Sequence, residues 1–265
     1  MYQRDFDYSN DIIAHKLSVV LMADSFFYSV FDVDGLLICH KSYTGIRFSD
    51  ASSISPIASD PALKHRYTMV SVVIMSGDMH QADTYDMALF DTMPGLELDI
   101  HKIDKLPGQT IYNYYGINPH QQHLLVHLFG DNGFTVYSFP FLLAAYFVGL
   151  SQPMIHIHPN ENTIFIYVQK DDKLHLYNAI DFKNGNDVLY FVMAAAKFVG
   201  IDPNGDTLYI SGWLETNSTL YTQLDGYFQN IRLVQDVSFR LHPSAATSFK
   251  PHYYFVHFNN ILCGL

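Results

Sequence analysis

The chain of 265 residues has little cysteine, and its apolar runs are short. Its two cysteines, Cys39 and Cys263, form neither a disulfide framework nor a CxxC metal or redox motif, which is typical of a reducing compartment. No run approaches the ~20 apolar residues that cross a bilayer, and residues 139–150 are better explained as a buried helix. Residues 1–11 are polar and acidic, unlike a signal peptide. These absences predict a soluble cytoplasmic protein without a transmembrane segment.

Basic residues are also scarce. Fifteen Lys and Arg stand against 26 Asp and Glu, so the formal net charge is −11, and no basic cluster offsets it. Such a charge opposes binding to a phosphate backbone, and we expect no nucleic-acid partner. A hydrophobic content of 49% and an aromatic content of 15% exclude disorder and predict a large core.

The common catalytic motifs are absent. The chain has no GxxxxGK[ST] loop, GxGxxG fingerprint, GxSxG elbow or HExxH pair. Its 14 histidines include a helical cluster (His120, His123, His127) and a strand pair (His156, His158), but no third ligand with an acid or base partner can be identified. We therefore predict no catalytic residue, no metal and no cofactor.

Two stretches of the chain share one pattern. Residues 154–158, 163–168 and 173–180 read as three strands separated by polar turns, followed by a helix over 187–199 and a strand over 207–210. Residues 17–22, 26–32 and 36–43 repeat the meander, and placing Leu17 under Met154 aligns the two without a gap. This predicts an internal duplication with halves at 1–150 and 151–265. Two unrelated meanders are the alternative.

The remaining runs predict a mixture of helices and strands. Helices are expected at 80–90, 120–129, 141–150 and 218–228, and strands at 69–75, 134–139, 231–235 and 253–261. Residues 96–103 and 110–115 look extended. Residues 243–251 look like a loop, as do residues 49–66 apart from a short helix near 61–66.

A family resemblance follows from the central stretch. The string MIHIHPNENTIFIYVQKDDKLHLYNAIDFKNGNDVLYFVMAAAKFVGIDP, with LSVVLMADSFFYSVFDVDGLLICHK near the start, resembles the bacterial domain of unknown function 3822. The match is good over about 150–235, weaker before, and gains little from the tail beyond Asp236. That family is similar to the actin-like ATPase superfold, which includes actin, sugar kinases, chaperone ATPases and PilM. The resemblance implies an α/β fold made of a duplicated ribonuclease-H-like βββαβαβ unit, with a nucleotide cleft between the halves.

The resemblance also implies where a nucleotide would bind. The two phosphate turns of the superfold correspond to Asp24 and Ser25 in the first half and to Asn160 and Glu161 in the second. The adenosine site corresponds to Ser211 and Gly212. Both phosphate turns lack the glycine that lets backbone N–H groups approach a phosphate. We therefore expect a degenerate cleft that is closed to ATP and holds water or a partner side chain.

Two functions remain open at this stage. The first is a non-catalytic interaction or scaffold role with a protein partner. The alternative is an atypical nucleotide-binding ATPase or kinase of the same superfold. Tyr112, Tyr114 and Tyr115 are candidates for an exposed interaction surface, and core packing is the other explanation for them.

Overall fold

The first large sheet grows from an antiparallel meander. In the computed structural model, which describes residues 5–8, 15–97, 99–236 and 238–263, the meander is β2 (Lys16–Met22), β3 (Ser25–Phe31) and β4 (Leu36–Thr44). β5 (Met69–Ile74) joins β2 in parallel, and β9 (Thr135–Ser138) joins β5. The short strands β1 (Phe6–Asp7) and β15 (Arg240–Leu241) pair with β4. Between β4 and β5 run the helix α1 (Ala51–Ser59) and the 3-10 helix η2 (Pro61–Lys64).

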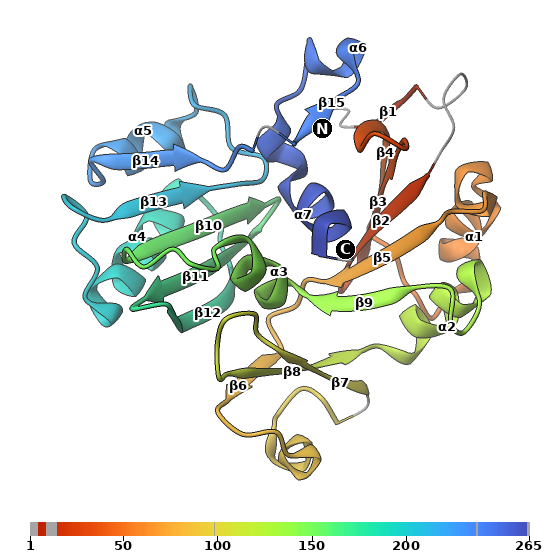
Figure 1. Ribbon diagram of the computed structural model, residues 1–265, viewed down its shortest axis with the longest axis horizontal. Helices are drawn as coiled ribbons and strands as arrows, with labels where there is room; N and C mark the ends of the chain where they lie inside the picture. The colour runs from red at the N-terminus through yellow and green to blue at the C-terminus, as the bar shows by residue number, and fades with distance from the viewer. Residues whose placement is uncertain (1–4, 9–14, 98, 237, 264–265) are drawn as a thin grey trace.

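The second large sheet repeats this plan (Figure 1). β10 (Met154–Asn160), β11 (Thr163–Lys170) and β12 (Lys173–Asp181) form the meander, and β13 (Thr207–Ile210) pairs in parallel with β10. β14 (Asn230–Leu233) continues the sheet. α4 (Gly185–Val199) begins at a capping box of Asn184 and Asp187 and ends at Gly200 in the left-handed region. α5 (Thr219–Asp225) packs beside it.

The register of the duplication differs by one residue from the sequence alignment. The first hairpin closes on the pair Met22 and Ser25, and the second closes on Asn160 and Thr163. Met22 is therefore equivalent to Asn160, whereas aligning Leu17 with Met154 pairs it with Pro159. Because side chains alternate across a strand, this shift exchanges the two faces. The duplicated α/β architecture is confirmed, and its residue equivalences are corrected.

A small third sheet lies beside the first (Figure 1). It consists of β6 (Met79–Ala82), β8 (Tyr112–Ile117) and β7 (Ile100–Lys105). The helix predicted at 80–90 is wrong, because Met79–Ala82 pairs with β8 and only η3 (Met87–Thr92) is helical. α2 (Pro119–Phe129) and α3 (Phe139–Tyr146) flank β9 in sequence, as predicted.

The C-terminal tail is the main correction to the predicted elements. Residues 253–261 form no strand: η4 (Pro251–Tyr254) leads into the helix α7 (Phe255–Cys263). α7 packs on β2, β5 and α3 and lies between the two large sheets (Figure 1). Every α7 residue from 255 to 261 is buried, so the helix has no polar face to reveal its period. The residues predicted as loops also contain α1, which Asp50 caps, and α6 (Pro243–Ala246).

Candidate functional site

The two equivalent hairpins meet at the seam between the halves. Asn160 Nδ2 donates a hydrogen bond to Met22 Sδ at 2.8 Å, so the last residues of β10 and β2 touch directly. The two turns that the resemblance assigns to phosphate binding follow these residues. Their strands therefore leave little space between them.

A small cavity remains beside this contact. Its volume is about 40 Å³, and the residues around it include Met22, His40, His158, Asn160, Tyr253 and His257. One water needs about 10–15 Å³, so the cavity has room for a few waters. Ligand pockets usually span about 300–1,000 Å³.

Behind the cavity, one serine joins two buried histidines. Ser211 Oγ lies 2.8 Å from His156 Nε2 and 2.8 Å from His158 Nδ1. His156 Nδ1 has no partner within the described chain. A proton on that atom would be a buried unpaired donor, so His156 Nε2–H donates to Ser211, and the Ser211 hydroxyl donates to His158. Burial lowers the pKa of His158 to about 3 and, with the neighbouring His158, holds the pKa of His156 well below its usual value.

The same arrangement occurs on the other side of the cavity. His40 Nδ1 lies 2.9 Å from Ser29 Oγ, and His257 Nδ1 lies 3.0 Å from Ser18 Oγ. Asn260 Nδ2 in turn donates to Ser18 Oγ at 2.8 Å. Burial, and then the nearby His40, hold the pKa of His257 well below its usual value. The three imidazoles around the cavity are thus each oriented through Nδ1 by a serine hydroxyl.

The predicted site residues do not all face this cavity. Asn160 lines it, and Ser211 lies directly behind it. Asp24 and Glu161 are exposed at the tips of their turns, and Glu161 has a φ of 45°. Ser25 is buried, and its hydroxyl donates to Asp24 at 2.9 Å. Whether these residues bind a nucleotide stays a prediction.

Gly212 holds its loop against the end of β10. Its φ is 79°, and a Cβ there would lie 2.8 Å from the Pro159 carbonyl oxygen and 3.0 Å from the His158 ring. The Gly212 N–H donates to the His252 carbonyl at 2.9 Å. The position requires glycine because of both its backbone conformation and this close approach.

The tail supplies the site residues that sequence reasoning missed. Tyr253, Val256 and His257 line the cavity, and Tyr253 stacks on Trp213 with ring centroids 4.5 Å apart. Tyr253 also donates to Glu215. The signal in the sequence was polar His257, Asn259 and Asn260 among apolar residues, which indicates buried hydrogen-bonded groups.

Other candidates from the sequence fall outside the cleft. Tyr114 and Tyr115 are buried in the first half, so their proposed exposed surface is wrong. Within the part of the chain that is described, no three His, Cys, Asp or Glu side chains are placed to hold a metal ion. No helix there is long and apolar enough to span a membrane.

Two sheets duplicated as βββαβ around a seam define a protein of the actin-like ATPase fold. The chain matches the family described as "Protein of unknown function (DUF3822)" over residues 8–231 and belongs to it. It is similar to a Bacteroides thetaiotaomicron protein of actin-like ATPase fold and unknown function, with a TM-score of 0.69, 16% identity, and 92% of this chain and 99% of that one covered.

A second similar structure is the PilM–PilN type IV pilus biogenesis complex, whose matching chain gives a TM-score of 0.67 at 10% identity. The match covers 94% of this chain and 98% of that one. Identities this low support the shared fold alone. No curated protein matches the chain.

Proposed function

We propose that this protein is a non-catalytic interaction or scaffold protein that keeps the actin-like fold with a degenerate nucleotide cleft. The observation that carries the proposal is the cavity of about 40 Å³ at the seam. Met22 and Asn160 close it from the two hairpins, and Tyr253 and His257 close it from the tail. A nucleotide would have to displace these side chains.

The electrostatics of the seam also oppose phosphate binding. None of the described residues that line the cavity is Lys or Arg. Asp24 and Glu161 add carboxylates at the turn tips, and Pro159 has no N–H to donate. A phosphate there would meet negative charge without compensation.

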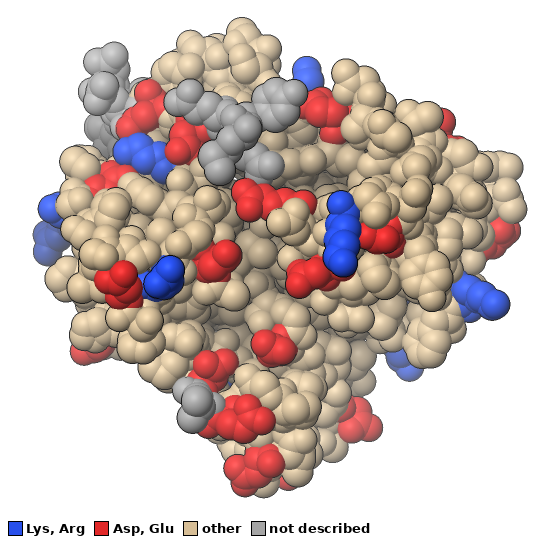
Figure 2. Space-filling view, turned by 180° about the vertical axis from the view of Figure 1, so that it is seen from behind, with Lys and Arg blue, Asp and Glu red and all other residues tan. Residues whose placement is uncertain are grey.

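A protein partner is supported by a neighbour of the same fold. The PilM structure is that of a complex with PilN, so this fold serves a protein assembly in at least one relative in structure. Nucleic acid is a poor candidate, because Lys and Arg lie scattered among more frequent Asp and Glu on the face seen from behind (Figure 2). We further propose halves at 1–150 and 151–265 and a cytoplasmic location, the latter supported by two free cysteines.

The second candidate is an atypical ATPase or kinase. It is favoured by the fold itself and by two features that resemble those of the actin-like superfold. These are an acid, Asp24, at the first turn and a close-packed glycine, Gly212, after β13. In that case Mg·ATP would open the seam on binding.

Titration calorimetry with Mg·ATP, followed by a hydrolysis assay, separates the two functions. We expect no binding heat and no change in melting temperature at 5 mM Mg·ATP. A Kd of 50 µM would instead stabilise the fold by about 2.7 kcal/mol and raise the melting temperature by roughly 5–10 °C. Micromolar binding that Asp24→Ala abolishes, and that the matched variant Asp34→Ala at the exposed β3–β4 turn retains, would establish the ATPase alternative.

A further inference from the structure

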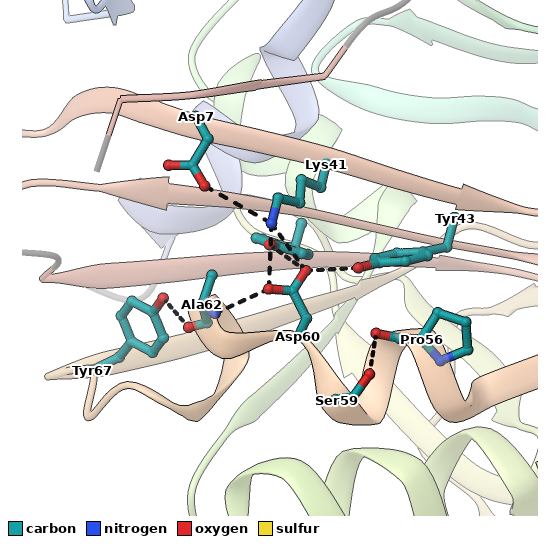
Figure 3. A network of polar contacts seen from close by, with 9 residues as sticks. Asp7, Lys41, Tyr43, Pro56, Ser59, Asp60, Ala62 and Tyr67 are labelled. Carbon is teal, nitrogen blue, oxygen red and sulfur yellow. Dashed lines mark hydrogen bonds and ion pairs between the residues drawn. The ribbon is translucent and has the colours of Figure 1, made fainter. Parts of the chain in front are cut away.

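Equivalent places on the two sheets are covered differently. In the first half, Asp60 at the junction of α1 and η2 lies on the sheet (Figure 3). Its carboxylate accepts hydrogen bonds from Tyr28 at 2.8 Å and Tyr43 at 2.6 Å, and Lys41 approaches to 3.3 Å. Asp60, at the junction of the two helices, therefore covers this face of β3 and β4.

In the second half the equivalent positions carry no ion pair: a buried isoleucine replaces the tyrosine, and an exposed asparagine replaces the lysine. Tyr28 on β3 pairs with Lys41 on β4. The equivalent pair in the second meander is Ile166 on β11 with Asn178 on β12. The connection over them is α4, an unbroken helix without a counterpart of Asp60. It leaves a groove of about 290 Å³, whose walls include Ile166, Leu176, Ile180, Phe191, Ala195 and Phe198.

The exposed side of α4 is unusually apolar for this acidic protein. Its exposed residues are Asn186, Tyr190, Ala194, Lys197 and Phe198, and none is acidic. Tyr190 is 68% exposed and Phe198 77% exposed. Tyr190, Ala194 and Phe198 are spaced four apart, so they form one stripe along the helix. We call these three residues the α4 stripe.

We propose that a second copy of this chain binds the α4 stripe, with the two α4 helices antiparallel about a twofold axis at Ala194. In an isologous interface residue i of one copy contacts residue j of the other, and j contacts i. The order aromatic, small, aromatic therefore lets a twofold axis at Ala194 place an aromatic ring on an aromatic ring at both ends. Phe198 of each copy then packs on Tyr190 of the other and over the rim of the groove. Ala194 at the axis allows the helices to approach closely.

The area and the charge set how tight this contact is. Each aromatic ring offers about 200 Å², of which some three quarters is exposed, so two rings per copy bury roughly 600 Å² in all. A standard interface buries about 1,600 Å², so the groove walls must add area, and we expect a reversible micromolar dimer. Each copy carries a net charge of −11, but the stripe has no acid. The repulsion is therefore long-range and falls with salt.

Sedimentation velocity from 5 to 500 µM protein tests the proposal. We expect a monomer–dimer equilibrium that shifts toward dimer when NaCl rises from 0.1 to 0.5 M. Phe198→Ser and Ala194→Arg, both at exposed positions, should weaken the dimer at least tenfold. The control Tyr85→Ser removes a ring that is 63% exposed beside the third sheet and should leave the dimer intact. A monomer at 500 µM, or a dimer that neither stripe variant weakens, would overturn the proposal.

Disulfide trapping tests the twofold axis itself. Packed helices have axes about 8–10 Å apart, and each Cα lies about 2.3 Å from its axis, so facing Ala194 Cα atoms are roughly 3.4–5.4 Å apart. The upper part of this range allows a disulfide. In a Cys263→Ser background, oxidised Ala194→Cys should form a covalent dimer. Asn186→Cys, about 12 Å along the helix from the axis, should not. Cross-linking at Asn186 alone would refute the antiparallel arrangement.

Discussion

Acid should unfold this protein through the buried imidazoles of the seam. Burial lowers the pKa of His158 to about 3, and burial with a neighbouring histidine holds the pKa values of His156 and His257 well below the usual 6.5. In the unfolded chain these side chains titrate near pH 6.5. Below that pH the unfolded state binds more protons than the folded state. Stability is therefore complete above pH 6.5 and falls as the pH drops.

The size of the effect follows from the same linkage. An imidazole that stays neutral in the folded state at pH 5 costs about 2 kcal/mol, because each pH unit below its unfolded pKa is worth 1.36 kcal/mol. Three such groups cost about 6 kcal/mol, within the range of about 5–15 kcal/mol for the whole stability of a protein. None of the described residues around the cavity is Asp or Glu, so no carboxylate there offsets a proton.

Urea unfolding at pH 7.5 and pH 5.0 measures this cost. His158→Gln should be less stable than the wild type at pH 7.5, but should lose about 2 kcal/mol less on acidification. His120→Gln, at an exposed position on α2, is the control and should keep the wild-type difference. Burial raises the pKa of Asp104, which stabilises the folded state in acid and acts in the opposite direction, so the test is the variant comparison. An unchanged pH difference in His158→Gln would refute the reasoning.

Further substitutions test the contacts that shape the seam and the first sheet, each by urea unfolding at pH 7.5. Gly212→Ala should cost more stability than Gly45→Ala. Both glycines have positive φ, which costs an alanine about 1–2 kcal/mol, but only at Gly212 would the added Cβ also meet a carbonyl oxygen. Equal losses would argue against the clash. Asp60→Ala should cost about 2–4 kcal/mol, since it leaves the hydroxyls of two tyrosines without their acceptor, whereas loss of the exposed cap Asp50 should cost less. Ser211→Ala should cost about 1–3 kcal/mol by removing the partner of two buried imidazoles, and a neutral result would contradict the hydrogen bonds assigned to it.

The sequence predicts the parts of the fold that begin and end at clear caps or polar turns. α4 has buried apolar residues at helical spacing and strong caps, and the six meander strands are bounded by polar turns, so both could be placed from pattern alone. α7 could not, because it is enclosed on all sides and its polar residues His257, Asn259 and Asn260 are buried with the apolar ones, so no polar face marks the helical period. The one-residue error in the duplication has a similar cause. The strands of the two aligned hairpins, β2 with β3 and β10 with β11, are buried on both faces, so alternation gives no register.

The sequence could indicate the residues of the candidate site that lie at strand ends, but not those that come from β4 and the tail. Asn160 ends β10, and Ser211 and Gly212 follow β13, so all three lie where the ends of neighbouring strands meet, and the family resemblance names them. The cavity, however, also needs His40 from β4 and His257 from α7, which are far apart in the sequence and are joined only by the packing of the tail. No local sequence pattern predicts that these two residues lie close together.

The corrected register explains how the seam became polar. With Met22 equivalent to Asn160, the counterparts of His156 and His158 are Ser18 and Val20. The duplicated strands therefore differ at the positions that meet there: the second half supplies two imidazoles, and the first supplies Ser18, which binds His257 of the tail. Hydrogen bonds are directional, so the Ser18–His257 bond orients the tail on the first sheet, and the Asn160–Met22 bond orients the two hairpins. The Ser211 bonds lie within the second half and hold its two imidazoles in place. The cavity at the seam is therefore lined by some of the same groups, Met22, Asn160 and His257, that make these contacts.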